Sequence, residues 1–194
     1  MDIRPITLEG KIVRLEPLSM SHLDGLSAVG LDENLWRYTL TVIRNRNDME
    51  RYLESALQAQ KQGSALPFAI IEKTSGRAVG STRYGNIDLE NRRLEIGWTW
   101  IGQAWQRTSV NSECKYLLLR HAFESLGCIR AEFKTDAINV PSRKALLRIG
   151  ATEEGTFRNH MITSTGRIRH SAYYSIIDSD WPEVKRSLEE KLAK

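Results

Sequence analysis

The sequence predicts a mixed α/β (α+β) fold, with a central and mostly antiparallel sheet of about seven strands flanked by helices. Three observations lead to this prediction. Segments of alternating apolar residues are interspersed with segments of helical periodicity. Two pairs of strand-like segments enclose short turns, which predicts two antiparallel hairpins. The strand–helix–strand segment from Leu94 to Lys134 requires a parallel crossover, so the sheet is mixed.

Length and composition predict one globular domain. The chain has 194 residues, of which 41% are hydrophobic and 27% are charged, and a typical domain has about 150 residues. No internal repeat or long linker is visible. We therefore expect residues 1–194 to form a single domain, with its core over about 8–178 and a C-terminal helix over about 181–192.

Membrane and secretory classes are not expected. No apolar stretch approaches the roughly 18 residues of a membrane span, and Met1–Pro5 lacks the apolar core of a signal peptide. Cys114 and Cys128 have no metal-ligand spacing and fit buried thiols in a reducing compartment. We expect a cytoplasmic protein without a membrane partner.

The net charge of +4 is too small to indicate nucleic-acid binding by itself. Its distribution is more informative, because the segment from Gly155 to Ile177 contains Arg158, Arg167 and Arg169 and no acidic residue. This segment could bind an anionic ligand, or it could be the solvated face of a strand. Both interpretations stay open from the residues alone.

The first half of the chain predicts three strands and two helices. The first strand alternates polar and apolar residues and ends before Pro17. Asn47, with Glu50 three residues later, predicts the cap of the second helix, and Gly63 predicts its end. The turn Thr74–Gly76 joins two strands into a hairpin. The expected elements are strands at 11–15, 67–71 and 78–84 and helices at about 19–29 and 48–62.

The second half predicts four strands and three helices. Gly127 is expected to stop a long amphipathic helix, and Pro141 and Gly150 mark the first turn and the end of the next one. The turn at 164–166 joins the last two strands. The expected elements are strands at 94–101, 129–134, 155–163 and 167–177 and helices at 109–126, 139–149 and 181–191.

Several chemistries find no support in the sequence. The phosphate-loop, dinucleotide-binding, zinc-protease and serine-hydrolase motifs are all missing. The four histidines are far apart and show no ligand spacing. We therefore expect no metal site.

The segment from Trp98 to Asn111 is the strongest local candidate for a ligand site. It joins a strand end to the start of a helix through a polar loop. Free N–H groups and the macrodipole make a helix N-terminus suitable for a phosphate group. Many β-to-α turns share this composition, so the segment alone does not decide the function.

A wider set of motifs resembles the GNAT superfamily of acetyl-CoA-dependent N-acetyltransferases. The closest likeness is to the ribosomal-protein serine and alanine N-terminal acetyltransferases. The resemblance implies that the fourth and fifth expected strands splay apart and that the pantetheine arm of acetyl-CoA lies between them. The motifs that carry it are Leu94–Trp98, Trp105–Asn111, Ala122-Phe123, Leu126-Gly127, Ile129-Arg130, Asn139 with Ser142, and Ile149–Ala151.

The resemblance also implies a set of cofactor-binding residues. The family's Q/R-x-x-G-x-G/A loop falls on Gln106, Ser109 and Asn111, so both glycines are replaced. Ser109 could offer its hydroxyl to a phosphate, and Asn111 could adopt the left-handed conformation that glycine otherwise supplies. Asn139 matches the family's pantetheine-contacting Asn, or it caps a helix, or both. The residues expected at acetyl-CoA are Trp98, Trp100, Ile101, Gln106, Arg107, Thr108, Ser109, Val110, Asn111, Ser112, Asn139 and Arg143.

The chemistry of amine acetylation requires a base, an oxyanion donor and an acid. Glu95 is the candidate base, because strand alternation places it opposite the face shared by Leu94, Ile96 and Trp98. The alternative for Glu95 is a solvent-facing strand carboxylate. Main-chain N–H near Trp100 would stabilise the oxyanion. Ser142 is the candidate for positioning or protonating the thiolate, or it is only a helix-cap residue; the tyrosine of many relatives is replaced by Leu146.

The acceptor is expected between the first two helices, the Trp36–Tyr38 segment and the final hairpin. Trp36 and Tyr38 could line the acceptor or belong to the core, and Arg158 could bind an acceptor carboxylate. The first hypothesis is an acetyl-CoA-dependent N-acetyltransferase in which a primary amine (a protein N-terminus, an amino acid or a small amine) attacks directly in a ternary complex. The alternatives are a degenerate acyl-CoA-binding sensor and, last, an RNA- or ribosome-binding module. A homodimer is left open.

Overall fold

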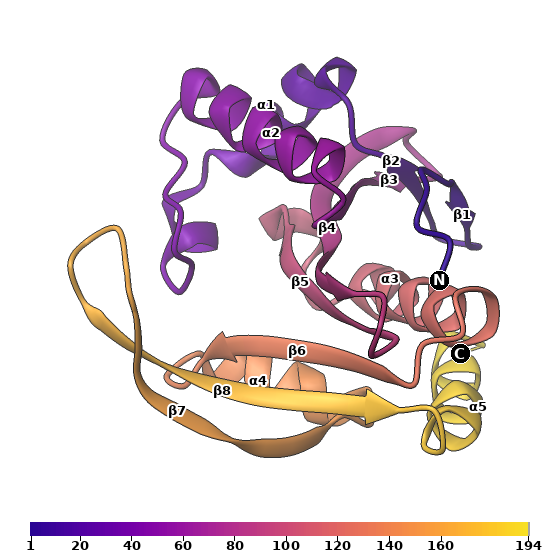
Figure 1. Cartoon of the computed structure of the whole chain (residues 1–194). Helices are drawn as coiled ribbons and strands as arrows, with labels where there is room; N and C mark the ends of the chain where they lie inside the picture. The colour runs from indigo at the N-terminus through magenta and orange to yellow at the C-terminus, as the bar shows by residue number, and fades with distance from the viewer. Residues whose placement is uncertain (194) are drawn as a thin grey trace.

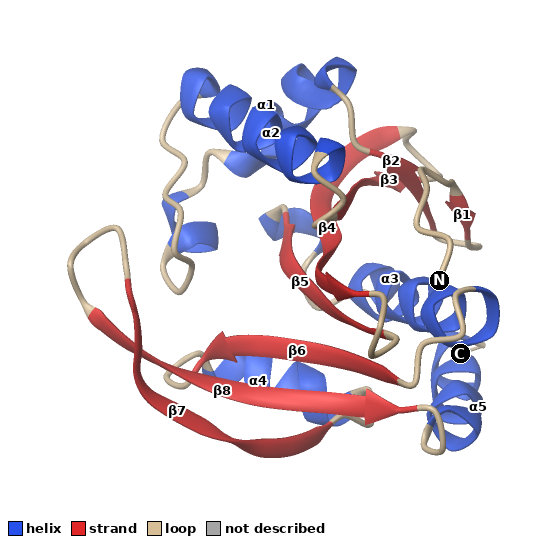
Figure 2. Ribbon diagram, viewed as in Figure 1, coloured by secondary structure: helices blue, strands red, loops and turns tan. Residues whose placement is uncertain are grey.

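Eight strands form one open sheet in the computed structural model, which describes residues 1–193 and leaves Lys194 of the expected domain outside the described residues. The strand order is β1-β2-β3-β4-β5-β6-β8-β7 (Figures 1 and 2). The strands are β1 (Leu8–Glu9), β2 (Val13–Pro17), β3 (Leu66–Glu72), β4 (Arg77–Asp88), β5 (Arg93–Ile101), β6 (Arg130–Asp136), β7 (Thr152–Ile162) and β8 (Ile168–Ile177).

Five α-helices accompany the sheet, and none of the helices over residues 1–193 has both the length and the apolar content to cross a membrane. The long third helix continues beyond Arg120 as a π-helical turn, His121–Ser125, before Gly127 ends it at a φ of 67°. The helices are α1 (Leu23–Gly30), α2 (Arg46–Lys61), α3 (Ser109–Arg120), α4 (Val140–Arg148) and α5 (Trp181–Leu192).

The pairing of β5 with β6 is the one parallel contact in the sheet. It covers only Arg93–Glu95 against Arg130–Glu132, after which the two strands diverge. Every other neighbouring pair is antiparallel. Since β5 and β6 are the fourth and fifth expected strands, the predicted mixed sheet with a splay at this place is confirmed (Figure 2).

The helices cover both faces of the sheet and create two cores. On one face, α1 and α2 pack with Leu26, Trp36 and Leu53. On the other face, α3, α4 and α5 enclose a larger core that includes Leu117 and Phe133 (Figure 1). The sheet therefore separates the helix that begins after the polar loop, α3, from the two N-terminal helices.

The sequence misplaced some element ends. The cap of α2 is Asn45, not Asn47, because Asn45 has extended backbone and its side chain accepts a 3.0 Å hydrogen bond from the N–H of Asp48. The first expected strand, β2, begins two residues later than predicted. The sheet has an eighth strand, β1, because a two-residue strand is too short to show periodicity.

A buried carboxylate ties α3 to the start of the sheet. Glu113 is 4% exposed and accepts main-chain hydrogen bonds from Lys11, Ile12 and Val13 at 2.7–2.8 Å. Gly10 packs so closely that a Cβ there would lie 2.5 Å from a Glu113 oxygen. Three charge-assisted donors compensate the burial of this carboxylate.

Replacing Glu113 by Gln is expected to destabilise the protein by about 3 kcal/mol, because the amide keeps one acceptor and turns a donor toward main-chain N–H groups. Urea denaturation measures the change. Glu190→Gln on the exposed side of α5 is the matched control and should stay within about 0.5 kcal/mol of the parent. Equal stabilities of the two variants would contradict this account of the α3 anchor.

Candidate active site

A β-bulge at Trp98 shapes the open edge of β5. The register with β4 shifts between Ser81 and Arg83, and Trp98 has a φ of 50°. The ring of Trp98 lies over Gly85, where a Cβ would come within 2.3 Å of it. Trp98 is therefore on the same face as Glu95, not on the face of Leu94 as strict alternation predicted. The ring is 42% exposed.

Beyond the bulge, the main chain of β5 faces the splay. The ladder between β5 and β6 stops at Glu95 and Glu132, so within residues 1–193 the later part of β5 has no strand partner on that side. The side chains of Trp100 and Ile101 point into the two opposite cores and are 5% and 7% exposed. Only their main-chain groups can contact a ligand.

The loop before α3 is held by its own side chains. Gln106 donates a 3.0 Å hydrogen bond to the carbonyl of Ile101. Thr108 caps α3: its hydroxyl donates to the Trp105 carbonyl at 2.7 Å and accepts from the Val110 N–H at 3.3 Å. These bonds fix the direction of the loop where it enters the helix.

The conformation of this loop differs from the prediction that Asn111 adopts the left-handed conformation of a glycine. Ser109 and Asn111 both lie in the first turn of α3, whereas the left-handed residue is Arg107, with a φ of 61°. Asn111 therefore does not replace a left-handed glycine. The first turn leaves the N–H groups of Ser109 and Asn111 without helical partners. Exposed Arg107 lies beside them.

The remaining first-turn residues differ in exposure. Val110 belongs to the apolar core and is 2% exposed, so its side chain cannot contact a polar ligand. Ser112 is half-buried in the next position of α3. The donors that face solvent are thus main-chain groups with the side chains of Thr108 and Ser109 around them.

Asn139 and Ser142 lie at the start of α4, which covers the far side of the splay. The side-chain oxygen of Asn139 accepts a 3.2 Å hydrogen bond from the Ser142 N–H, so the predicted cap is present. Ser142 is half-buried. Arg143 uses all three guanidinium nitrogens on the protein itself, through Tyr174, the Ala137 carbonyl and Glu153. The structure gives Arg143 a packing role between α4 and β7–β8.

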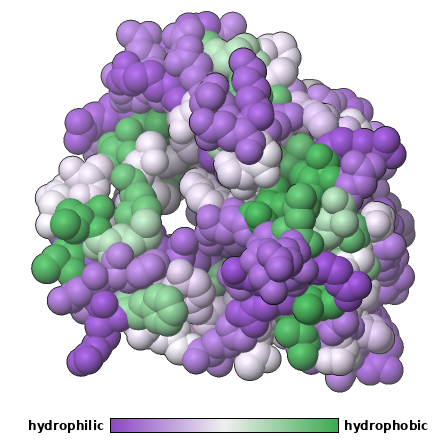
Figure 3. Space-filling model, in the orientation of Figure 1, coloured by the Kyte–Doolittle hydropathy of each residue, from purple (hydrophilic) through white to green (hydrophobic). Residues whose placement is uncertain are grey.

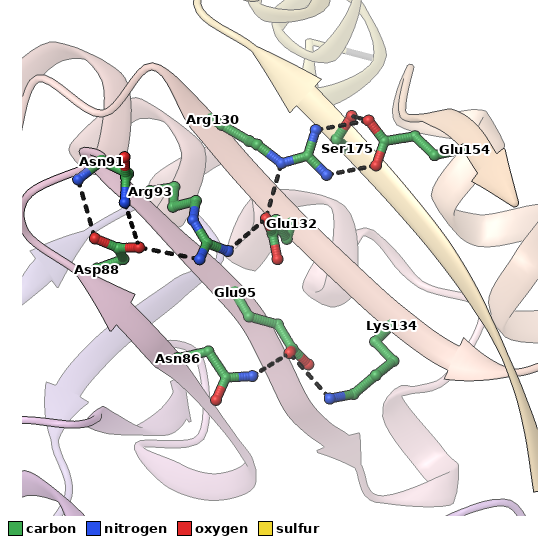
Figure 4. Close-up of polar contacts among 10 residues, drawn as sticks. All are labelled: Asn86, Asp88, Asn91, Arg93, Glu95, Arg130, Glu132, Lys134, Glu154 and Ser175. Atoms are coloured by element: carbon green, nitrogen blue, oxygen red, sulfur yellow. Dashed lines mark hydrogen bonds and ion pairs between the residues drawn. The ribbon is translucent and has the colours of Figure 1, made fainter. Parts of the chain in front are cut away.

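Glu95 is buried where β5 and β6 separate. It is 4% exposed, so the alternative of a solvent-facing carboxylate is wrong. Its Oε2 atom accepts a 2.7 Å hydrogen bond from Asn86 and lies 3.2 Å from Nζ of Lys134 on β6 (Figure 4). Its Oε1 atom lies over Gly97. Oε2 is thus held by Asn86 and Lys134, and Oε1 lies over the main chain of β5 at Gly97.

A second charge network closes the sheet next to Glu95. Arg93 contacts Asp88 and Glu132, and Arg130 contacts Glu132 and Glu154 (Figure 4). The adjacent carboxylates raise the pKa of Arg130. This network links the last paired residues of β5 and β6 to β7, and it fixes the point from which the two strands diverge.

A buried lysine on α3 contacts both strands that border the splay, and the sequence analysis missed it. Lys115 is 6% exposed and donates a 2.8 Å hydrogen bond to Thr99 on β5, while its ammonium lies 5.9 Å from the ring of Phe133 on β6. Thr99 in turn pairs with Thr82 at 2.7 Å. Burial lowers the pKa of Lys115 to about 8. Its position on the inward face of an amphipathic helix was the signal available in the sequence.

The predicted acceptor residues occupy different environments. Trp36 is a core residue, 3% exposed, which donates to the Gly30 carbonyl and packs against Trp100. Tyr38 is half-buried beneath Arg37. The loop around Trp36 and the tip of the β7–β8 hairpin line a hollow of about 200 Å³. The face seen in Figure 3 is also open near its centre, where Figure 1 has β5 facing the hairpin.

The three arginines of the basic hairpin segment also differ. Arg158 is exposed and lines a wide hollow of about 930 Å³ with Phe157 and His170. Arg167 pairs with the buried Asp136, and Arg169 donates to Ser171. Two of the three arginines are therefore engaged within the protein, and the segment is not a continuous solvated basic face.

The comparisons with known proteins agree with this geometry. The family model described as an acetyltransferase (GNAT) domain matches residues 13–152. The chain belongs to the GNAT acetyltransferase family. The predicted family and fold are thereby confirmed, and N-acetyltransferases of this family use acetyl-CoA and an amine acceptor.

The relatives of this GNAT protein span nearly the whole chain. The uncharacterized N-acetyltransferase p20 of Bacillus licheniformis is 25% identical over 176 residues, which are 90% of this chain and 98% of that protein. A GCN5-related N-acetyltransferase from Brucella melitensis superposes with a TM-score of 0.90 at 34% identity, covering 97% of this chain and 86% of that one. Mycobacterium smegmatis RimJ, in complex with CoA-disulfide, shares the fold with a TM-score of 0.82 at 21% identity, over 96% and 95% of the two chains.

Lys115 gives a testable dependence of stability on pH. Its pKa is lowered from 10.5 to about 8 in the folded chain, so the unfolded chain binds this proton more tightly. The free energy of unfolding therefore rises as the pH increases from about 8 to 10.5. Below pH 8 the buried ammonium costs about 3 kcal/mol, at about 1.4 kcal/mol per pKa unit.

Lys115→Met is accordingly expected to be more stable than the parent at pH 7, with an advantage that shrinks by pH 10. Urea denaturation at both pH values measures it. Lys144→Met, at an exposed position of α4, is the control and should show no such dependence. A stability difference for Lys115→Met that is the same at both pH values would refute the assignment.

Proposed function

We propose that this protein transfers an acetyl group from acetyl-CoA to a primary amine by direct attack in a ternary complex. The observation that carries the proposal is the splay, where unpaired main chain of β5 lies next to the buried carboxylate of Glu95. The acceptor classes are a protein N-terminus, an amino acid or a small amine. The proposal includes a cytoplasmic location, in keeping with the two free cysteines.

The residues around the loop fit the anionic end of acetyl-CoA. The N–H groups of Ser109 and Asn111, with the α3 macrodipole, would hold the diphosphate, and Arg107 and Thr108 would flank it. The main chain of β5 after Glu95 would pair with the pantetheine amides. The Asn139 side chain, whose oxygen caps α4, keeps its amide NH₂ for the same arm.

The chemistry needs little from the side chains beyond proton transfer. Acetyl-CoA supplies a carbonyl carbon to which the amine nitrogen bonds while the thiolate leaves. Glu95 would accept the ammonium proton, directly or through water, at the oxygen that Asn86 and Lys134 leave open. Main-chain N–H near Trp100 would stabilise the oxyanion, and the Ser142 hydroxyl would position or protonate the thiolate.

The acceptor would enter on the face of α1 and α2. The hollow between the Trp36 loop and the hairpin tip opens near Arg167, whose partner Asp136 shares its face of β6 with Lys134. Trp36 would support this hollow from the core, with Tyr38 and Arg158 toward its rim. The exposed edge strand β7 is available to a second copy, so a homodimer stays a prediction.

The structure weakens the two alternative functions. The replaced glycines and the absent tyrosine, which Leu146 replaces, motivated the sensor hypothesis. Ser109 and Asn111 have helical backbone that does not need glycine, and we propose Ser142 for the role of the absent tyrosine hydroxyl. The basic hairpin motivated the RNA- or ribosome-binding hypothesis, but Arg167 and Arg169 make contacts within the protein. No specific observation favours either alternative over acetyl transfer.

Ser109→Asp separates cofactor binding from folding. The added carboxylate lies at the positive end of the α3 macrodipole, so it should stabilise the helix by about 0.5 kcal/mol. It should also repel the diphosphate and raise the Kd for CoA at least about 10-fold, or 1.4 kcal/mol. Calorimetric titration measures this affinity. Ser109→Ala, which keeps the N–H, should bind within about threefold of the parent. Unchanged CoA affinity in Ser109→Asp would place the diphosphate elsewhere.

Glu95→Gln should lower kcat about 100-fold or more, because it removes the general base. Ser142→Ala should lower it by about 10-fold, since water can replace a hydroxyl donor. Thiol release from acetyl-CoA, measured with peptides, amino acids, polyamines and aminoglycosides, provides the assay. Glu90→Gln, at an exposed position in the turn between β4 and β5, is the matched control and should retain activity. Normal turnover in both active-site variants would exclude these roles, and no release with any amine would exclude the proposed function.

A further inference from the structure

Arg83 is a buried cation without an anion. It lies on β4 and is 6% exposed, and its side chain makes no hydrogen bond or ion pair within residues 1–193. Its Nε atom is fully buried and lacks an acceptor. Burying a charged group without a compensating partner is costly, so the position of Arg83 requires an explanation.

Two aromatic rings hold the guanidinium in place. Its central carbon lies 5.2 Å from the ring centroid of Tyr52 on α2 and 5.1 Å from that of Trp98 on β5. Tyr52 also donates a 3.4 Å hydrogen bond to the Trp98 carbonyl, which links these two aromatic residues. Cation–π contacts offset part of the cost of burial. They leave the Nε–H donor buried and unpartnered, and the two terminal nitrogens have no hydrogen-bond partner among residues 1–193.

Arg83 lies beside Glu95 on the acceptor face of the sheet. Its register partner on β5 is Gly97, and Glu95 pairs with Gly85 two residues farther along β4. Oε1 of Glu95 extends over Gly97, where a Cβ would lie 2.9 Å from it. Gly97 therefore places no side chain between the open carboxylate oxygen and the guanidinium, which lie on neighbouring strands about 5 Å apart, whereas the Trp98 ring covers Gly85.

The other cations near this face already have partners. Lys134 pairs with Glu95, Arg167 with Asp136, and Arg130 with Glu154. Arg169, though buried, donates to Ser171. Arg169 also has no ion pair, but its side chain makes this hydrogen bond. Among these cations Arg83 therefore differs in having neither an ion pair nor a side-chain hydrogen bond within residues 1–193, so it can bind an anion that the chain does not supply.

We propose that Arg83 binds the carboxylate of the amine acceptor, so that the acceptor is an amino acid or a compact derivative with its primary amine next to a carboxylate. The inference rests on the proposed acetyl transfer. A planar carboxylate matches the in-plane donors of a guanidinium that contacts two aromatic rings. The amine would then lie at Glu95. Polyamines and aminoglycosides, which bring further positive charge to Arg83, would be poor acceptors.

The test compares amino acids with their amides, which differ only in the carboxylate. Leucine with leucinamide and phenylalanine with phenylalaninamide are measured by thiol release, with putrescine as the cationic probe. The parent should prefer each acid over its amide by about 10- to 100-fold in kcat/KM, the range of a hydrogen-bonded charge pair. Equal use of acid and amide, or a preference for putrescine, would overturn the inference while leaving acetyl transfer intact.

Variants of Arg83 assign the preference to this residue. Arg83→Met keeps the packing between the rings and should bring the acid-to-amide ratio close to 1 through a higher KM for the acid. Arg83→Lys should restore part of the ratio because it restores the charge. Arg120→Gln, which removes an arginine stacked on Tyr116 at the far end of α3, should keep the parent ratio. A parent-like ratio in Arg83→Met would refute the role of Arg83.

A binding measurement keeps the inference testable without turnover. In the presence of CoA, each acid should raise the melting temperature of the parent more than its amide does, and Arg83→Met should lose this difference. CoA affinity should be the same in both proteins, since α3 lies on the opposite face of the sheet from Tyr52. If no amine releases CoA but the acids still stabilise only the parent, the proposed function fails and the carboxylate site stands.

Discussion

The site depends on one constraint, the separation of β5 from β6 after three paired residues. Once the ladder stops at Glu95 and Glu132, each strand must be held by its other neighbour, and β8 does this for β6 over all of Arg130–Asp136. The bulge at Trp98 bends β5 away. Main-chain groups in a protein interior need partners. A ligand with amide groups can supply them here without displacing an existing ladder, which supports the proposed binding of the pantetheine arm in the splay.

The sheet also divides the chemistry between its two faces. The face of α3 offers main-chain donors at Ser109 and Asn111 and the single buried ammonium of Lys115. The opposite face carries the buried carboxylate of Glu95 and the guanidinium of Arg83. Elsewhere neighbouring strands stay paired apart from local register shifts and separate these faces, whereas at the splay two neighbouring strands part. A donor held from one side and an acceptor held from the other can therefore meet at one place in the molecule, which favours a ternary complex over a covalent intermediate on the protein.

The sequence predicted the fold well because its strands, hairpins and helix ends are marked by local patterns. The parallel crossover from Leu94 to Lys134 follows from geometry, and with the family resemblance it located the splay. The face of Trp98 was wrong because a bulge adds one residue without changing the apolar alternation that the sequence shows. Arg83 was missed for a related reason: in Thr82-Arg83-Tyr84 it reads as an ordinary polar position of a strand. Its burial without an anion depends on residues far away in the sequence, such as Tyr52, and a local sequence pattern does not show such contacts.

The loop before α3 shows how a family pattern can be replaced without losing the conformation it encodes. Glycine is required where φ is positive or where a Cβ would block an approaching ligand. In this chain the positive φ is carried by Arg107, and the cap Thr108 stabilises the turn with two hydrogen bonds. Ser109 and Asn111 then enter the helix with ordinary backbone, and their N–H groups point out of its first turn. The proposed diphosphate contact depends on the direction of these groups, so the backbone conformation gives no argument against acetyl-CoA binding at this loop.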